Sequence, residues 1–332
     1  MRGDESPRGA EAFDQCLRLM IGAEGLADRA GEVFRARDAV FEGFQADWQR
    51  RNMKFDLSMS CGEGVGRAVR FSYNNFGEAP DFERKIARVF SLYPGVYDRD
   101  ALGRVLETMK PTDERHQTTL GFEWTAGGGP PRIKVYFEEL QHRYSLEQRR
   151  DFARRLLDIA GAAEEPPRES LAAIAVDFLP GGGLAAKLYS VFRTLDDVVA
   201  AIPGISRADF IQRWREACAA LSRERKAFYY VTRRRRGRTL LSMKLYKIYE
   251  FAQFESDSPA WIEIGEWLGA RDAAAARRIQ QLRLVSARHG GRLYPVIASV
   301  DCAFDGGLKR DLYFSIRPGG QATPSLDLGG AP

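Results

Sequence analysis

Three pairs of a lysine and a tyrosine stand two residues apart in this chain: Lys134 and Tyr136, Lys187 and Tyr189, and Lys244 and Tyr246. Successive side chains of a β-strand point to opposite faces, so each pair would present its ammonium group and its phenol on the same face. Fixed cations can stabilise negative charge that develops on a phosphate group. An aromatic ring can stabilise a neighbouring cation by roughly 0.5–2 kcal/mol. The pairs therefore predict a surface on which cations and aromatic rings lie side by side.

Each pair lies on the second strand of a predicted β-hairpin. The clearest example is the segment 132–137, where Arg132, Lys134 and Tyr136 alternate with three apolar residues. A glycine-rich turn at 126–130 joins this segment to an alternating segment upstream, as expected for a hairpin. Five such hairpins follow one another, with second strands that end near Tyr73, Tyr136, Tyr189, Tyr246 and Tyr313.

The five copies are not identical. The first copy has Arg70 on the polar face and Tyr73 on the apolar face. The last copy keeps Tyr313 and has Asp311 where the other copies have lysine. We interpret the series as an imperfect internal repeat.

Helical periodicity separates the hairpins. Apolar residues recur at helical spacing, and the expected helices span residues 11–51, 82–90, 101–109, 145–159, 206–221 and 261–287. Ser145 and Gln148 have the spacing of a capping box at the start of one helix. Hairpins with one apolar face can bury it under helices and close into a barrel with their polar faces inward. The sequence therefore predicts an α+β fold, a ten-stranded antiparallel β-barrel of five hairpin-plus-helix repeats with the helices outside.

Composition restricts the setting of this fold. The chain has 332 residues, a net charge of +5 and a sequence pI of about 9.0. Its four cysteines lie far apart, which argues against a zinc site and a disulfide framework. No apolar run approaches the ~20 residues of a membrane span, and the N-terminus lacks the apolar core of a signal peptide. We expect a cytoplasmic protein with a single domain over residues 1–332 and flexible tails at 1–10 and 318–332.

Five hairpin-plus-helix units, Lys-x-Tyr on the second strands and no metal-binding aspartate cluster together resemble the ABBA aromatic prenyltransferases. The resemblance covers roughly residues 50–317. It implies a barrel whose lumen binds an allylic diphosphate beside an aromatic acceptor. The diphosphate contacts would fall on Arg70, Lys134, Lys187 and Lys244, and the prenyl chain would be shielded by Tyr136, Tyr189, Tyr246 and Tyr313.

Three positions depart from the pattern of the indole-directed members of the family. Ala185 stands where those members often have a second basic residue, Lys244 stands where glutamine is common, and the last strand offers Asp311. These differences concern the acceptor more than the donor. A small aromatic molecule is the expected acceptor, and the side chain of a ribosomal peptide is an alternative.

Prenyl transfer also needs a base that removes a proton from the acceptor after attack. Alternation places three carboxylates, those of Asp56, Glu123 and Asp177, on the face that would line the lumen. We assign the catalytic role to Glu123 and Asp56, with Glu123 as a charge partner of Arg132 and Lys134 in the alternative interpretation. Asp56 resembles the position where some phenol-directed members hold magnesium. We expect no required cofactor and no protein-bound metal, and magnesium use stays open.

A non-catalytic function is the competing hypothesis. The barrel could store an anionic ligand, or a basic surface could bind nucleic acid. The run from Arg233 to Arg238 is the densest positive charge, and we interpret it as a solvated hairpin turn. We therefore expect an allylic diphosphate and an aromatic or peptide acceptor as partners, and neither a membrane nor nucleic acid.

Overall fold

The computed structural model describes residues 6–41, 55–61, 68–75, 79–108, 118–138, 144–162, 171–192, 229–236, 239–248, 272–303 and 308–318, with single positions at 197, 264 and 268. In strands β7 and β8 the backbone alone is described. The strands are β1 (Phe55–Cys61), β2 (Ala68–Asn75), β3 (Thr118–Thr125), β4 (Arg132–Phe137), β5 (Leu171–Phe178), β6 (Leu184–Phe192), β7 (Tyr229–Arg236), β8 (Thr239–Ile248), β9 (Gly291–Ala303) and β10 (Leu308–Pro318).

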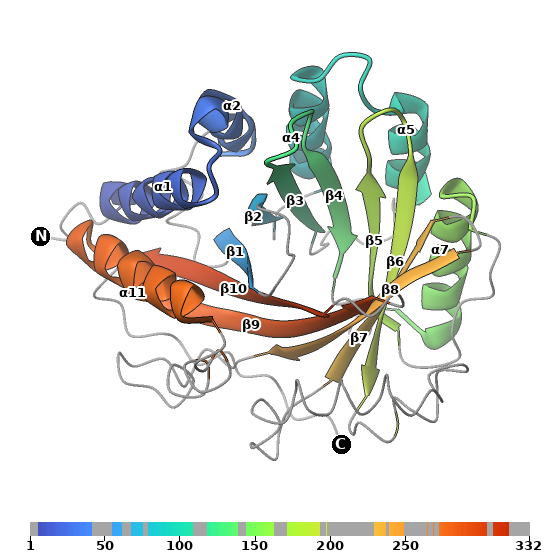
Figure 1. Ribbon diagram of the computed structural model, residues 1–332. Coiled ribbons are helices and arrows are strands. Elements are labelled where there is room, and N and C mark those ends of the chain that lie inside the picture. Colours follow the sequence, from blue (N-terminus) through green and yellow to red (C-terminus); the bar gives the residue numbers. More distant parts are fainter. Residues whose placement is uncertain are drawn as a thin grey trace, which may run out of the picture.

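The described strands form one antiparallel sheet that curls into a closed barrel (Figure 1). Each strand pairs with its neighbours in the chain, and β1 pairs with β10 to close the ring. This antiparallel meander confirms the predicted kind of sheet. This pairing places β1, from the N-terminal part of the chain, beside β10, from the C-terminal part.

Helices cover the outside of the sheet (Figure 1). They are α1 (Ser6–Ala23), the 3₁₀ turn η1 (Ala27–Arg29), α2 (Ala30–Val40), α4 (Ala79–Ser91), α5 (Arg99–Thr108), α7 (Leu146–Ile159) and α11 (Ala273–Arg288). At the start of α7 the predicted capping box is present. The Ser145 hydroxyl accepts a hydrogen bond from the backbone N–H of Gln148, and the Gln148 side chain accepts one from the backbone N–H of Ser145.

No helix in the described ranges is long and apolar enough to cross a membrane. The cytoplasmic location stays a prediction.

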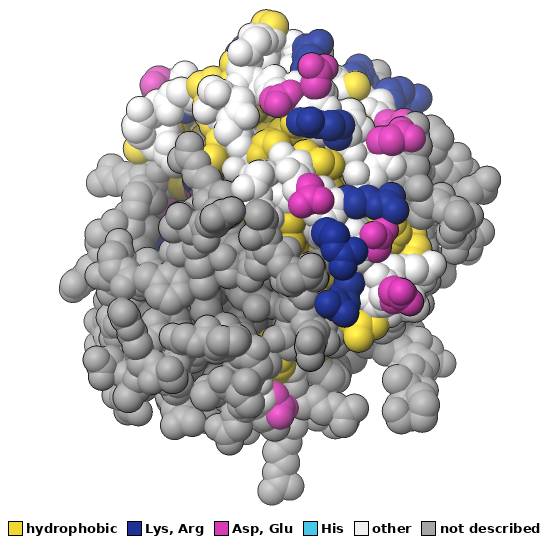
Figure 2. All heavy atoms as spheres, turned by 90° about the vertical axis from the view of Figure 1, so that its right-hand side faces the viewer, with side chains coloured by type: hydrophobic (Ala, Val, Ile, Leu, Met, Phe, Trp, Pro, Cys, Tyr) yellow, Lys and Arg dark blue, Asp and Glu magenta, His cyan; other side chains and the backbone are white. Residues whose placement is uncertain are grey.

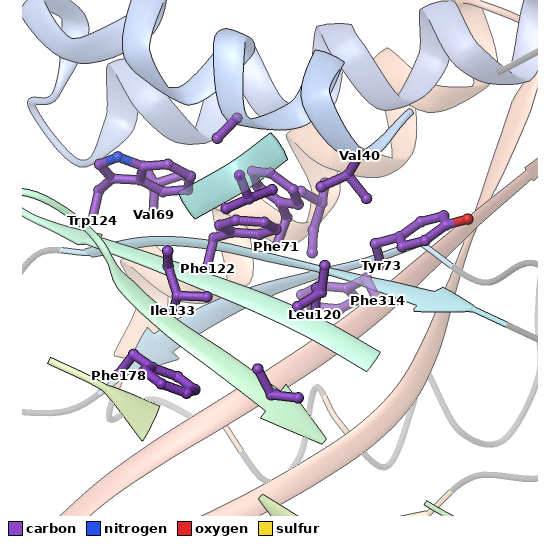
Figure 3. Close-up of a cluster of buried hydrophobic side chains, with 14 of the residues drawn as sticks. Val40, Val69, Phe71, Tyr73, Leu120, Phe122, Trp124, Ile133, Phe178 and Phe314 are labelled. Carbon is purple, nitrogen blue, oxygen red and sulfur yellow. The ribbon is translucent and has the colours of Figure 1, made fainter. Parts of the chain in front are cut away.

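The apolar faces of the strands bury themselves against these helices. Phe71 of β2 stacks on Trp124 of β3 with ring centroids 5.6 Å apart, and Phe13 of α1 meets Phe71 at 6.2 Å. Figure 3 shows this layer, with Phe71 and Trp124 pointing toward the helices. Burying an aromatic side chain of this size stabilises the fold by about 1.5–3 kcal/mol, so the apolar faces of the strands turn outward to the helices. The polar faces of the same strands are then left to the lumen.

Tyr73 lies on this outer apolar face, as predicted for the first hairpin. It is fully buried, packs edge-on against Phe41 at 5.6 Å, and its hydroxyl accepts a hydrogen bond from Lys85 of α4. Tyr73 is therefore part of the contact between barrel and helix and does not line the lumen.

Two predictions about local structure were wrong. The helical segment 11–51 is divided, because Gly25 takes a positive φ of 69° at the end of α1 and α2 ends at Val40. Arg233–Arg236 do not form a hairpin turn, because β7 runs to Arg236 and β8 begins at Thr239, so only Gly237 and Arg238 connect the two strands. The five-repeat organisation stays a prediction, since the helices expected at 206–221 and 261–271 fall mainly outside the described residues.

Candidate functional site

Strand register places the polar residues of four strands next to one another in the lumen. Arg70 of β2 lies opposite Ser58 of β1 on one side and Glu123 of β3 on the other. Glu123 lies opposite Arg132 of β4. Paired residues on an antiparallel sheet share a face, so these side chains point into the lumen together.

Glu123 is the point where three of these cations meet. Its Oε2 atom lies 2.5 Å from Lys134 Nζ, 3.3 Å from Arg70 Nε and 3.6 Å from Arg132 Nη1. The Glu123 side chain is buried, so these contacts are poorly screened by water. One carboxylate oxygen therefore forms ion pairs with three cations, which come from two strands.

Asp311 of β10 is the second anion of the group and is almost fully buried. Its Oδ1 atom lies 2.9 Å from Arg70 Nη1 and 3.5 Å from Lys309 Nζ. The Ser60 hydroxyl of β1 donates a hydrogen bond of 2.5 Å to the same oxygen. Arg70 thus bridges two carboxylates that lie on opposite sides of it. We call Arg70, Glu123, Arg132, Lys134, Lys309 and Asp311 the lumen charge cluster.

The lumen charge cluster holds an excess of positive charge. Four cations share two carboxylates through the contacts above, so the six groups carry +2 when all are ionised. Burial would raise the pKa of Glu123, but Lys134, Arg70 and Arg132 outweigh it and hold this pKa well below its ordinary value. Burial lowers the pKa of Arg70, and Glu123 and Asp311 more than reverse this shift. Arg70 and Glu123 therefore stay charged across the working pH range.

Lys134 differs from the other cations of the cluster. Burial lowers its pKa to about 7, although Glu123 acts in the opposite direction. Lys187 also contributes to this lowered pKa, because a second ammonium group nearby disfavours the charged form. The charge of Lys134 therefore changes near neutral pH.

Lys187 and Asp177 extend the charged wall onto the next two strands. Lys187 Nζ of β6 lies 2.8 Å from Asp177 Oδ1 of β5, and Asp177 is fully buried. Asp177 lies opposite Lys134 in the register of β4 and β5. Charges therefore alternate in sign along the wall from β10 through β2, β3, β4 and β5 to β6.

Two of the predicted shielding tyrosines lie beside these cations. The rings of Tyr136 and Tyr189 have centroids 6.1 Å apart. Gly121 of β3 leaves room for this arrangement, since a Cβ atom at that position would lie 3.1 Å from the Tyr136 ring and 3.4 Å from Lys134 Cβ. Tyr313 of β10 is partly exposed and pairs in register with Ser58.

The remaining predicted residues are placed less completely. Asp56 is buried and shares its face of β1 with Ser60, four residues or about 13 Å further along the strand. Lys244 and Tyr246 lie on β8, opposite Asp301 and Ser299 of β9, and their side chains fall outside the description. Within the described ranges no group of three or more His, Cys, Asp or Glu could hold a metal ion.

Sequence reasoning missed two residues that join the site, Ser60 and Lys309, whereas it named Arg132 as a possible partner of Glu123 and noted Asp311 in place of a lysine. Alternation from Tyr313 would have placed Asp311 and Lys309 on the lumen face, because they lie two and four residues before it. Alternation from Asp56 would likewise have placed Ser60 there. No local signal shows that Asp311 and Arg70 meet.

On the described surface around α7, positive charge is balanced by neighbouring carboxylates. Figure 2 shows the side that carries α7, where Lys and Arg side chains are interspersed with Asp and Glu. On α7, Asp151 pairs with both Arg154 at 3.5 Å and Arg155 at 2.6 Å. This part of the described surface is not a continuous basic patch of the kind that binds nucleic acid.

Solved structures show the same architecture along nearly the whole chain. A 5-dimethylallyl tryptophan synthase from Streptomyces coelicolor, in complex with DMASPP and Trp, matches with a TM-score of 0.70 at 15% identity. The match covers 98% of this chain and 99% of that chain. This chain has the fold of the ABBA aromatic prenyltransferases.

Two further structures with the prenyltransferase fold illustrate its range. A 6-dimethylallyltryptophan synthase from Micromonospora olivasterospora, in complex with DMASPP and Trp, has a TM-score of 0.64 at 12% identity, over 94% of this chain and 99% of that chain. NotF in complex with brevianamide F and DMSPP has a TM-score of 0.65 at 13% identity, over 95% of each chain. No protein-family profile and no curated protein sequence matches this chain. The likeness to a prenyltransferase is thus a likeness of fold.

Proposed function

We propose that this protein is an aromatic prenyltransferase that moves a prenyl group from dimethylallyl or geranyl diphosphate to an electron-rich aromatic acceptor. The observation that carries the proposal is the lumen charge cluster, in which four cations share two carboxylates inside a barrel. Ionisation of an allylic diphosphate leaves pyrophosphate, and fixed cations in a water-poor site stabilise the charge that develops on it. The excess of positive charge suits such an anion.

We assign the roles of the residues as the family resemblance implies. The donor diphosphate binds to four cationic side chains, those of Arg70, Lys134, Lys187 and Lys244. The prenyl chain is shielded by four tyrosines, Tyr136, Tyr189, Tyr246 and Tyr313. Aromatic faces keep water away from the allyl cation and stabilise it. Asp56 is the better candidate for the base, because the cations around Glu123 hold its pKa too low for ready proton transfer. Glu123 then acts as the charge partner of those cations.

The solved structures with this fold support the classes of donor and acceptor. They hold analogues of an allylic diphosphate together with tryptophan or with brevianamide F. We extend this to a small aromatic acceptor for the present protein. A peptide side chain is the runner-up acceptor, and no described residue favours it specifically.

The test is prenyl transfer with dimethylallyl and geranyl diphosphate against a panel of indoles, phenols and peptides, followed by mass spectrometry. We expect a mass increase of one prenyl group on at least one aromatic acceptor. Lys134→Ala and Lys187→Ala should each reduce turnover about ten- to a hundredfold or more, since a charge-assisted contact contributes roughly 1.5–3 kcal/mol. Lys85→Met is the matched control, because Lys85 is also buried but bonds to Asp81 and Tyr73 outside the lumen.

Other outcomes would identify a different function. Tight binding of pyrophosphate without transfer to any acceptor would indicate a barrel that stores an anionic ligand. Salt-dependent binding of nucleic acid that is lost when Arg233–Arg236 are replaced by serine would indicate a nucleic-acid binder. Unchanged turnover in both lysine variants would remove the assignment of the donor site.

A further inference from the structure

Lys134 shares its counter-ion with two other cations. The Glu123 oxygen that lies 2.5 Å from Lys134 Nζ also lies within 3.6 Å of Arg70 and Arg132. One carboxylate carries a single negative charge and cannot compensate all three cations, and of the nearby carboxylates Asp311 contacts Arg70 and Asp177 contacts Lys187. The ammonium form of Lys134 is therefore poorly supported without a further anion.

Charged groups from several strands face Lys134. Arg70 of β2 and Lys187 of β6 disfavour its ammonium form, whereas Glu123 of β3 and Asp177 of β5 favour it. Arg132 lies two residues away on the same strand, and beyond Arg70 the strand β10 contributes Asp311 and Lys309. The balance of burial and these neighbours puts the pKa of Lys134 at about 7. At pH 8 only about a tenth of the Lys134 side chains would then be charged.

We propose that binding of an allylic diphosphate delivers a proton to Lys134, with the diphosphate replacing Glu123 as the partner of this lysine. This inference rests on the proposed function and adds to it a proton that enters with the donor. The proton passes from the solvent to the lone pair of neutral Nζ, one N–H bond forms, and no bond of the donor breaks. The diphosphate carries more negative charge than the shared carboxylate, so it favours the ammonium form more strongly.

The exchange leaves each group of the cluster with a partner. Glu123 loses Lys134 but keeps Arg70 and Arg132, so it remains ionised. Lys134 becomes fully charged only when an anion is present to receive it. In the empty lumen the repulsion between Lys134 and Lys187 is correspondingly weaker. Glu123 is thus a positioning residue that holds the cations in place until the donor arrives.

Calorimetry of donor binding measures the proton directly. The probes are inorganic pyrophosphate and dimethylallyl thiolodiphosphate, each titrated at pH 6 and pH 8 in two buffers with different heats of ionisation. The baseline is Lys134→Arg, because arginine is always charged and takes up no proton at this position. The difference between wild type and Lys134→Arg removes the titration of the phosphate itself. We expect about one proton per donor at pH 8 and close to none at pH 6.

Two further variants separate this role from a merely structural one. Glu123→Gln removes the group that most favours the ammonium form of Lys134, so the proton uptake should begin at lower pH than in wild type. Lys85→Met should leave the uptake unchanged, because Lys85 lies outside the lumen.

Equal proton uptake by wild type and Lys134→Arg at pH 8 would overturn the inference. Prenyl transfer could still occur in that case, and the proposed function would stand. If wild type bound neither probe and transferred no prenyl group, the inference and the proposed function would fall together. Uptake by Glu123→Gln at the same pH as wild type would remove Glu123 from the exchange and overturn this part of the inference.

Discussion

At the scale of single residues, three carboxylates of the lumen balance the charge of its cations. Glu123 and Asp311 both contact Arg70, and Asp177 contacts Lys187. Asp56 shares the lumen face of β1 with Ser58, which lies opposite Arg70. A carboxylate tied to several cations is a weak base, so we propose Asp56 as the group that removes the proton.

Asp56→Asn should therefore lower prenyl transfer while donor binding stays intact. Proton removal after attack on an aromatic ring is usually easy, so the loss should be about 10²–10⁴-fold at most. The measurement is kcat with saturating donor, together with the affinity for pyrophosphate. Full activity in this variant would contradict the assignment of the base.

Asp311→Asn should change stability and donor affinity in opposite directions. A charge-assisted hydrogen bond contributes roughly 1.5–3 kcal/mol, so the free energy of unfolding should fall by about this amount because Arg70 loses one carboxylate. The same change removes a negative charge from the lumen and should tighten pyrophosphate binding severalfold. Urea unfolding and calorimetry measure the two effects.

The control for Asp311 is Asp14→Asn, which breaks a 2.8 Å pair with Arg37 on the helices. It should lower stability without any gain in pyrophosphate affinity. Weaker binding in Asp311→Asn would show that Asp311 holds Arg70 in the geometry that the donor needs.

At the scale of elements, the strand β7 changes the meaning of the arginine run. Because Arg233–Arg236 lie in a strand and not in a turn, consecutive arginines belong to opposite faces. Arg234 pairs in register with Lys187, and paired residues share a face of the sheet. Arg233 pairs in register with Leu188, so these two positions of the run belong to different faces of the sheet.

Arg234→Ser should weaken pyrophosphate binding about tenfold, whereas Arg233→Ser should leave it within about twofold, since a charge-assisted contact contributes roughly 1.5–3 kcal/mol. The measurement is calorimetry of both variants under one salt condition. Equal effects of the two substitutions would mean that the run acts as a diffuse positive charge and not through one position.

At the scale of the whole molecule, we expect the barrel to receive a diphosphate without a divalent ion. The six groups of the lumen charge cluster carry +2 when ionised, and Lys187 lies on the adjoining part of the wall. Prenyl transfer should therefore stay within about twofold when magnesium is removed with a chelator, because protein cations already stabilise the leaving pyrophosphate. The assay is turnover with and without chelator. A large loss of turnover in the presence of the chelator would contradict this expectation and would indicate that Asp56 is a metal ligand and not a base.

Local patterns were enough to predict which residues face inward and which face outward. Alternation placed Arg70, Lys134 and Glu123 on one face and Tyr73 on the other, because the direction of a side chain in a strand depends only on its position along that strand. The capping box of Ser145 and Gln148 was predictable for the same reason, since its bonds join residues three apart.

Contacts between distant strands depended on the tertiary structure alone. Arg70 and Asp311 are 241 residues apart and meet only because β1 pairs with β10 and closes the ring. The burial that lowers the pKa of Lys134 also depends on how the strands pack, and not on the pattern within one strand. A pattern in one strand specifies the face that a charge occupies, but its partners and its burial depend on which strands become neighbours when the barrel closes.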